Sequence, residues 1–243
     1  MPGPASSYEA VVLGMVDYGE RDRIVRLLTP ELGRVSALAR GARGSRRRYG
    51  GVLDLGARLR VMLRKGRGEL WLLQEAELVE ARLRLRESLL SMGLQSYASE
   101  LVGAFARDHH AEPRLFGLLE VFLTVLDAAT DPPAGMFRPG LEVKALTCAG
   151  FAPVLARCAR CGESLEGQVH FSADAGGALH PSCGAGEPVQ AEFLMALERA
   201  RMTRLVELLD MELPPGPTWL LARFAEHHLQ RGLSSRKWLE TVG

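Results

Sequence analysis

Residues 57–79, ARLRVMLRKGRGELWLLQEAELV, decide the fold of the N-terminal part of this 243-residue chain. In the first half, Leu59, Val61 and Leu63 alternate with arginines, which is the pattern of a strand that is buried on one face only. Gly66-Arg67-Gly68 forms a tight turn, and residues 69–79 return as a second strand. The stretch therefore predicts a β-hairpin with a basic outer surface.

Three further strands are predicted upstream of this hairpin. They are residues 9–16, 23–29 and 34–40, which are rich in apolar and β-branched residues and are separated by glycine- and proline-containing turns. Five short strands within about 80 residues favour a small closed barrel, because closure removes exposed sheet edges.

The apolar period changes to that of a helix downstream of residue 80. Large apolar residues recur at helical spacing over residues 90–105 and 115–126, and helices are also expected at 139–149, 189–212 and 218–231. The segment 154–187 has many glycines and few large apolar residues. It could not fold on a hydrophobic core of its own.

That core-poor segment carries a pattern typical of a structural zinc site, C-x2-C-x18-H-x2-C. Thiolates and neutral imidazole suit Zn²⁺, and each pair lies in a turn that lets both ligands reach one ion. His170 and Cys148 are rival ligands, and the two pairs could also lie in loops that never meet. The expected ligands are Cys158, Cys161, His180 and Cys183.

A catalytic zinc would need an open coordination position and a nearby carboxylate. Glu163 and Asp174 are close in sequence, but four ligands already complete the shell, and a deaminase-like H-x-E motif is absent. We therefore expect a structural ion and no enzymatic activity.

Charge is distributed unevenly, although the net charge is only +1. Residues 1–86 carry 17 Lys and Arg against 10 Asp and Glu, whereas residues 87–243 carry 13 against 19. Such asymmetry suggests a polyanionic partner for the N-terminal half. Nearly all the cations are arginine, which suits phosphate recognition but would also result from a GC-rich genome.

Two basic clusters lie on the predicted barrel, one around residues 40–48 and one at the hairpin turn. They are either ordinary solvated loops or a surface that follows a phosphate backbone, and two clusters on one small domain favour the second interpretation. The candidate nucleic-acid-binding residues are Arg34, Arg40, Arg43, Arg46, Arg47, Arg48, Tyr49, Arg58, Arg60, Arg64, Lys65 and Arg67.

Aromatic residues are scarce in this region. Residues 1–86 contain only Tyr8, Tyr18, Tyr49 and Trp71 as aromatics. Trp71 is expected to face the core, and Tyr49 is either a platform for a base or a packing residue. Binding should therefore be mainly electrostatic, sensitive to salt and weakly sequence-specific.

The overall composition is that of a soluble globular protein, with 47% hydrophobic and 24% charged residues. No apolar run is long enough for a membrane span, and the N-terminus does not resemble a signal peptide. Few cysteines outside the metal pattern also favour the cytoplasm.

Four segments together resemble the RecO family of bacterial recombination mediators and DNA-repair proteins. They are EAVVLGMVDYGERDRIVRLLTPELGRVSALARGAR (9–43), LTCAGFAPVLARCARCG (146–162), FSADAGGALHPSC (171–183) and GLSSRKWL (232–239). Their order along the chain matches the family, but His180 stands where many members have a cysteine.

The resemblance implies an α+β protein with a five-stranded oligonucleotide-binding (OB-fold) β-barrel, then an α-helical domain with an inserted zinc finger. The expected boundaries are 1–80 for the barrel, 81–153 and 188–243 for the helical domain, and 154–187 for the finger. It implies binding of single- and double-stranded DNA, strand annealing, and action with RecR to load RecA on DNA coated by single-strand-binding protein. Localisation would be cytoplasmic, with the nucleoid.

Two alternative functions remain open at this point. The same barrel could bind RNA in a zinc-stabilised or regulatory protein. A metal-dependent nuclease is disfavoured because no carboxylate cluster with metal-ligand spacing occurs.

Overall fold

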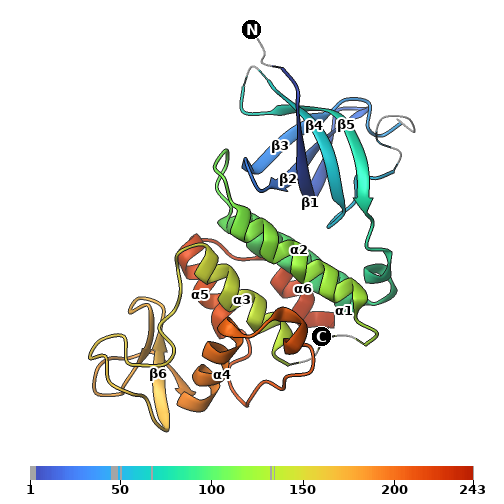
Figure 1. Ribbon diagram of the computed structural model, residues 1–243. Coiled ribbons are helices and arrows are strands. Elements are labelled where there is room, and N and C mark those ends of the chain that lie inside the picture. Colours follow the sequence, from blue (N-terminus) through green and yellow to red (C-terminus); the bar gives the residue numbers. More distant parts are fainter. Residues whose placement is uncertain are drawn as a thin grey trace. The chain divides into compact units, whose positions relative to one another are not determined.

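Five strands close into a barrel in the N-terminal part of the chain (Figure 1). The computed structural model describes residues 4–44, 49, 51–66, 68–131, 133 and 135–242. The strands are β1 (Ser6–Tyr18), β2 (Asp22–Thr29), β3 (Gly33–Ala39), β4 (Arg58–Lys65) and β5 (Trp71–Glu80), in the order β1-β2-β3-β5-β4. The predicted barrel is confirmed, and each strand lies within three residues of its expected bounds.

Strand β1 is long because it pairs with two neighbours. Residues Ser6–Val11 pair with β4 and Val11–Tyr18 pair with β2, and the register shifts between Val12 and Gly14. Such a bulge bends the strand so that it can serve both sides of a closed sheet. Closure is completed by a short parallel pairing of β3 with β5.

Alternating residues of all five strands fill the barrel. Leu59, Val61 and Leu63 are fully buried, as the alternation predicted, and they pack with Val25 and Leu27. Trp71 packs against the same core, edge-on to Tyr8.

Two helices follow the barrel within the same compact unit, which comprises residues up to Ala128 and those from Lys237 onward. They are α1 (Leu89–Phe105) and α2 (Pro113–Ala128), preceded by the 3-10 helix η1 (Leu83–Glu87). The Ser88 hydroxyl accepts a hydrogen bond from the backbone N–H of Ser91, which caps α1.

The loop between α1 and α2 packs tightly on the start of β3. Gly33 has a φ of +62°, and a Cβ added there would collide with the carbonyl oxygens of Arg107 and His110. Arg34 then donates two hydrogen bonds to the Asp108 carboxylate. Only glycine suits this approach.

A buried arginine connects the barrel to the helices. Arg82 lies just after β5, with a fully buried side chain and a left-handed φ of 52°. Its guanidinium donates to the Gly56 carbonyl and to the carboxylates of Glu80 and Glu120, and Glu120 of α2 also pairs with Arg58 of β4. The two arginines thus share one buried carboxylate.

The second compact unit spans Ala129–Arg236. It contains α3 (Phe137–Cys148), α4 (Ala191–Met202), the 3-10 helix η2 (Leu205–Leu208) and α5 (Leu220–Leu229), with α3 packed against the other three. The last helix, α6 (Ser234–Val242), begins here, and its residues from Lys237 onward belong to the first unit. There, Trp238 and Leu239 lie against Gly93 of α1.

The expected helix at 189–212 is interrupted. Thr203 adopts an extended conformation after α4, and both its backbone N–H and its hydroxyl donate to the Arg199 carbonyl at the helix end. Among the described residues, no helix is long and apolar enough to cross a membrane.

Between α3 and α4 lies a segment that we call the metal lobe, residues 154–190. It contains the antiparallel strands β6 (Gln168–Ser172), β7 (Gly177–Leu179) and β8 (Glu187–Gln190), in the order β7-β6-β8. Strands β6 and β7 form a hairpin, with its turn at residues 173–176. Its apolar interior is small and centres on Val169, Phe171 and Leu179.

Stability should depend strongly on Arg82. Replacing it in the variant Arg82→Met leaves Glu120 buried with one partner fewer, so the free energy of unfolding should fall by about 3–5 kcal/mol. Urea unfolding followed by circular dichroism measures this.

The matched control is Arg60→Met, because Arg60 and its partner Glu77 are both more than half exposed. That change should cost less than about 1 kcal/mol. Equal losses in the two variants would refute the special role of Arg82.

Candidate metal centre and nucleic-acid interface

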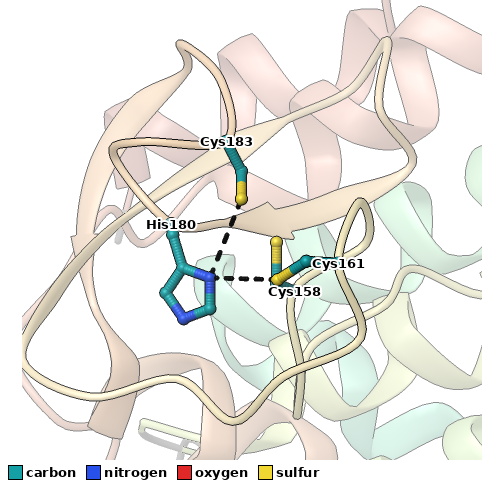
Figure 2. Close-up of side chains that lie close together, drawn as sticks. All are labelled: Cys158, Cys161, His180 and Cys183. Carbon is teal, nitrogen blue, oxygen red and sulfur yellow. Dashed lines mark hydrogen bonds between the residues drawn. The ribbon is translucent and has the colours of Figure 1, made fainter.

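The four expected metal ligands come together at one end of the metal lobe (Figure 2). Cys158 and Cys161 precede β6, and His180 and Cys183 follow β7. One donor atom from each lies within 4.8 Å of the other three. The alternative of two loops that never meet is therefore wrong.

Backbone hydrogen bonds hold each pair in its turn. The N–H of Gly162 donates to the carbonyl of Cys158, at 2.9 Å, and the N–H of Cys183 donates to that of His180, also at 2.9 Å. Gly162 has a φ of +82°, which a residue without a Cβ adopts at little cost. The Arg160 side chain donates to the Cys183 carbonyl and joins the two turns.

The orientation of His180 suits metal binding. Its Nε2 lies 2.8 Å from the carbonyl oxygen of Ser164, which can only accept, so Nε2 carries the proton. The Nδ1 lone pair then faces the sulfurs of Cys161 and Cys183, at 3.4 Å and 4.0 Å (Figure 2). A carbonyl that accepts a hydrogen bond from the other ring nitrogen commonly fixes the tautomer of a ligating histidine.

The cysteines differ in how readily they ionise. Burial of Cys158 opposes ionisation, but hydrogen bonds from the backbone N–H groups of Cys161, His180 and Arg160 outweigh it and lower the pKa of the thiol to about 5. Burial and the neighbouring cysteines raise the pKa of Cys183. A thiolate is thus already favoured at Cys158, and a cation at the centre would favour the others.

The spacing of the donors fits a tetrahedral ion. An ion with bonds of about 2.3 Å to sulfur and 2.0–2.1 Å to nitrogen separates its ligands by about 3.5–3.8 Å, close to the observed distances. The rivals His170 and Cys148 are not in the group; Nδ1 of His170 lies 2.8 Å from the Gly184 carbonyl instead. The group of Cys158, Cys161, His180 and Cys183 could therefore hold a metal ion.

The candidate nucleic-acid-binding arginines divide into two sets. Four are paired with carboxylates: Arg34 with Asp108, Arg43 with Asp17, Arg58 with Glu9 and Glu120, and Arg60 with Glu77. The hydrogen bond from Arg34 also lowers the pKa of Asp108. Arg58 is the least available of the four for contact with a phosphate, because it belongs to the Arg82–Glu120 network.

The other set lacks acidic partners among the described residues. It comprises Arg40 and Lys65, which are exposed, and Arg64, which is half-buried. Arg46, Arg47, Arg48 and Arg67 lie outside the described residues, so their roles stay predictions. The cations that face solvent without an acidic partner are the best placed to meet phosphates.

Tyr49 is a correction to the sequence analysis. Its side chain is only 2% exposed, and its hydroxyl donates to the carbonyl oxygen of Leu73 in β5 at 2.7 Å. The ring fills the barrel core beside β5, so the packing alternative is right and the base-platform alternative is wrong.

Two exposed arginines were missed. Arg21 lies in the β1–β2 turn and lines an open hollow of about 600 Å³ with Glu20, Gly41, Arg43 and Gly44. Arg26 projects outward from β2 between the buried residues Val25 and Leu27. The alternation of Arg26 with those two residues was the signal that could have identified it.

Comparison with known proteins matches both parts of the chain. Residues 5–82 match the family model described as Recombination protein O N terminal, and residues 86–237 match Recombination protein O C terminal. A DNA repair protein RecO of Anaeromyxobacter sp. (strain K) is 42% identical over 96% of this chain and 95% of its own length. Those of Myxococcus xanthus and Geobacter sulfurreducens are each 38% identical, over 97% and 96% of this chain and 97% of their own lengths.

The cysteine–histidine group should bind one metal ion per chain. Native mass spectrometry of the purified protein should find one equivalent, and Cys158→Ser should lose it because a hydroxyl is a much poorer ligand than a thiolate. Cys148→Ser, which alters a cysteine outside the group, should retain the ion. Loss of metal from both variants, or from neither, would contradict the assignment.

Proposed function

The chain belongs to the Recombination protein O family, and on this basis we propose that it binds single- and double-stranded DNA through its barrel and anneals complementary strands. The observation that carries the proposal is the concentration of exposed cations without described acidic partners on one small barrel: Arg21, Arg26, Arg40 and Lys65. The arginines at 46–48 add to this charge in the sequence.

Annealing of this kind needs no bond-making group. Cations neutralise the phosphates of two strands, which lowers their mutual repulsion and raises their local concentration until base pairing takes over. Arginines already engaged by carboxylates, such as Arg34 and Arg58, gain little from a phosphate because the existing pair must first break. We therefore assign DNA contact to the unpaired set and a structural role to these two.

We further propose that the chain acts with RecR to help RecA load onto DNA coated by single-strand-binding protein. This proposal comes from the family resemblance. It places the protein in the cytoplasm, with the nucleoid.

The ion in the metal lobe is proposed to be Zn²⁺ with a structural role. Three cysteines and one histidine lie close enough together to complete a tetrahedral shell, which would leave no position for a substrate. The lobe has a small apolar interior, and ion binding would supply the stability that this interior lacks. We propose no catalytic step at this site.

Annealing is tested directly with fluorescently labelled complementary strands. The purified protein should accelerate duplex formation, alone or with RecR present. Absence of acceleration in both conditions would reject the mediator proposal. Equal-sequence DNA and RNA oligonucleotides separate it from the alternative of an RNA-binding protein, which predicts tighter binding to RNA.

The salt dependence of DNA binding should change with the charge of the loop at 46–48. If about six phosphates of a single strand are neutralised, log K should fall with log salt at a slope of about −4. Replacing Arg46, Arg47 and Arg48 together with alanine should reduce that slope to about −2, because each lost contact removes about 0.7.

Arg60→Ala is the matched control, since Arg60 is already paired with Glu77. It should leave the slope within about 0.7 of the wild-type value. An unchanged slope in the triple variant would remove the 46–48 loop from the DNA site.

A further inference from the structure

The outer surface of the barrel carries a row of apolar side chains that the electrostatic account does not explain. Val16 of β1 pairs with Ile24 of β2, Ile24 pairs with Leu38 of β3, and Leu38 pairs with Leu72 of β5. Paired residues project from the same face of a sheet. These four side chains therefore lie side by side, and Val16 is 52% exposed.

Among the described residues, this row leaves Val16 exposed and Ile24, Leu38 and Leu72 half-buried, unlike the other end of the same face. Leu28 projects from β2 on the same side as Ile24 but is fully buried, and α2 packs against β2. No described element covers Val16. A soluble protein gains nothing from exposing such a row unless something binds there.

Tyr18 extends the row with an aromatic ring. It lies two residues beyond Val16 on β1 and therefore on the same outer face, and it is 54% exposed. Its partner on β2 is Asp22, whose carboxylate accepts a hydrogen bond from the backbone N–H of Gly41. The carboxylate beside the ring is thus engaged by the protein itself.

Cations border the row on both sides. Arg26 stands opposite Gly14, two pairs along from Val16 and so on the same face, and its guanidinium lies over the glycine, where an added Cβ would be 3.1 Å from Nη2. Arg40 follows Leu38 by two residues, and Arg21 lies in the turn after Tyr18. None of the three has a described acidic partner.

The apolar row, the exposed tyrosine and the bordering arginines together fit an unpaired nucleic acid strand better than a duplex or a protein. Bases offer flat apolar faces to an aromatic ring and to aliphatic side chains, and the phosphates beside them match the bordering arginines. A duplex hides those faces within its stack. A protein partner would suit the apolar row but would leave three unpaired cations facing it.

We propose that Tyr18 stacks on an unpaired base and makes the barrel prefer single-stranded over double-stranded DNA. The proposal rests on the proposed DNA-binding function and deepens it. Val16 and Ile24 continue the platform for a neighbouring base, and Arg26 and Arg40 hold the adjoining phosphates. Because stacking is open to every base, the preference is for strandedness and not for sequence.

The test compares affinities for a fluorescent single-stranded oligonucleotide and for its duplex. Tyr18→Leu keeps an apolar side chain but removes the ring, and it should weaken single-strand binding roughly five- to hundredfold while duplex binding stays within about twofold. Tyr18→Phe should bind like the wild type. Phe151→Leu is the matched control, because Phe151 is a 41% exposed aromatic in the other unit, and it should change neither affinity.

Photochemical cross-linking uses the wild-type protein, so its outcome does not depend on whether a variant folds. A single strand containing 5-iododeoxyuridine, irradiated in complex with the wild-type protein, should cross-link to Tyr18. Cross-links only elsewhere, an equal loss of both affinities in Tyr18→Leu, or no loss at all would overturn the inference and leave DNA binding intact. A wild-type protein that binds neither DNA would instead reject the proposed function, and this face would then be a protein-binding surface.

Discussion

The interaction on which the first unit depends is the sharing of Glu120 by Arg58 and Arg82. One arginine comes from the barrel, the other from the chain that leaves it, and the carboxylate from α2. A buried charge that loses a partner destabilises the fold by about 3–5 kcal/mol, so the contact is strong only when both arginines are in place. Arg82 must also adopt a left-handed backbone conformation to reach Glu120 and the Gly56 carbonyl. The barrel and the first two helices are therefore built as one body, as the division of the chain into units indicates.

That constraint separates arginines that look alike in the sequence. Arg58, Arg60 and Arg64 alternate on one strand and were all expected to meet nucleic acid, but Arg58 is held by two carboxylates and Arg60 by an exposed one. The outward cations without described acidic partners lie mainly at the other end of the barrel, around the β1–β2 turn and the end of β3. The outer apolar row, with the exposed Val16, lies there as well. Helices pack against one end of the barrel surface. The exposed arginines and apolar side chains that suit DNA lie at the end that the helices leave open.

Much of this was predictable from local pattern, because period-two alternation and turn residues specify strands wherever one face is buried. The four candidate metal ligands were predictable because a C-x2-C pair and an H-x2-C pair in a segment with few apolar residues are typical of a metal site. His180 completes the group in place of a cysteine. The role of Tyr49 was not predictable, since its neighbours in sequence are arginines whereas its neighbours in space are core residues of β5. Tyr18 was not identified as a candidate binding residue, although its side chain is exposed on the barrel surface. Nothing in the sequence shows that α2 packs against β2, where Leu28 is buried while Val16 stays exposed, because that depends on long-range packing.

The metal lobe and the barrel thus differ in chemistry: the lobe has four residues that could hold a metal ion, and the barrel presents charge and apolar surface. The most direct test is amide hydrogen exchange of the full chain with and without a single-stranded oligonucleotide. The account predicts slower exchange in β1, β2 and β3 and in the 40–44 loop, with residues 158–183 unchanged. Protection confined to residues 158–183 or to the helices, with the barrel unchanged, would contradict it.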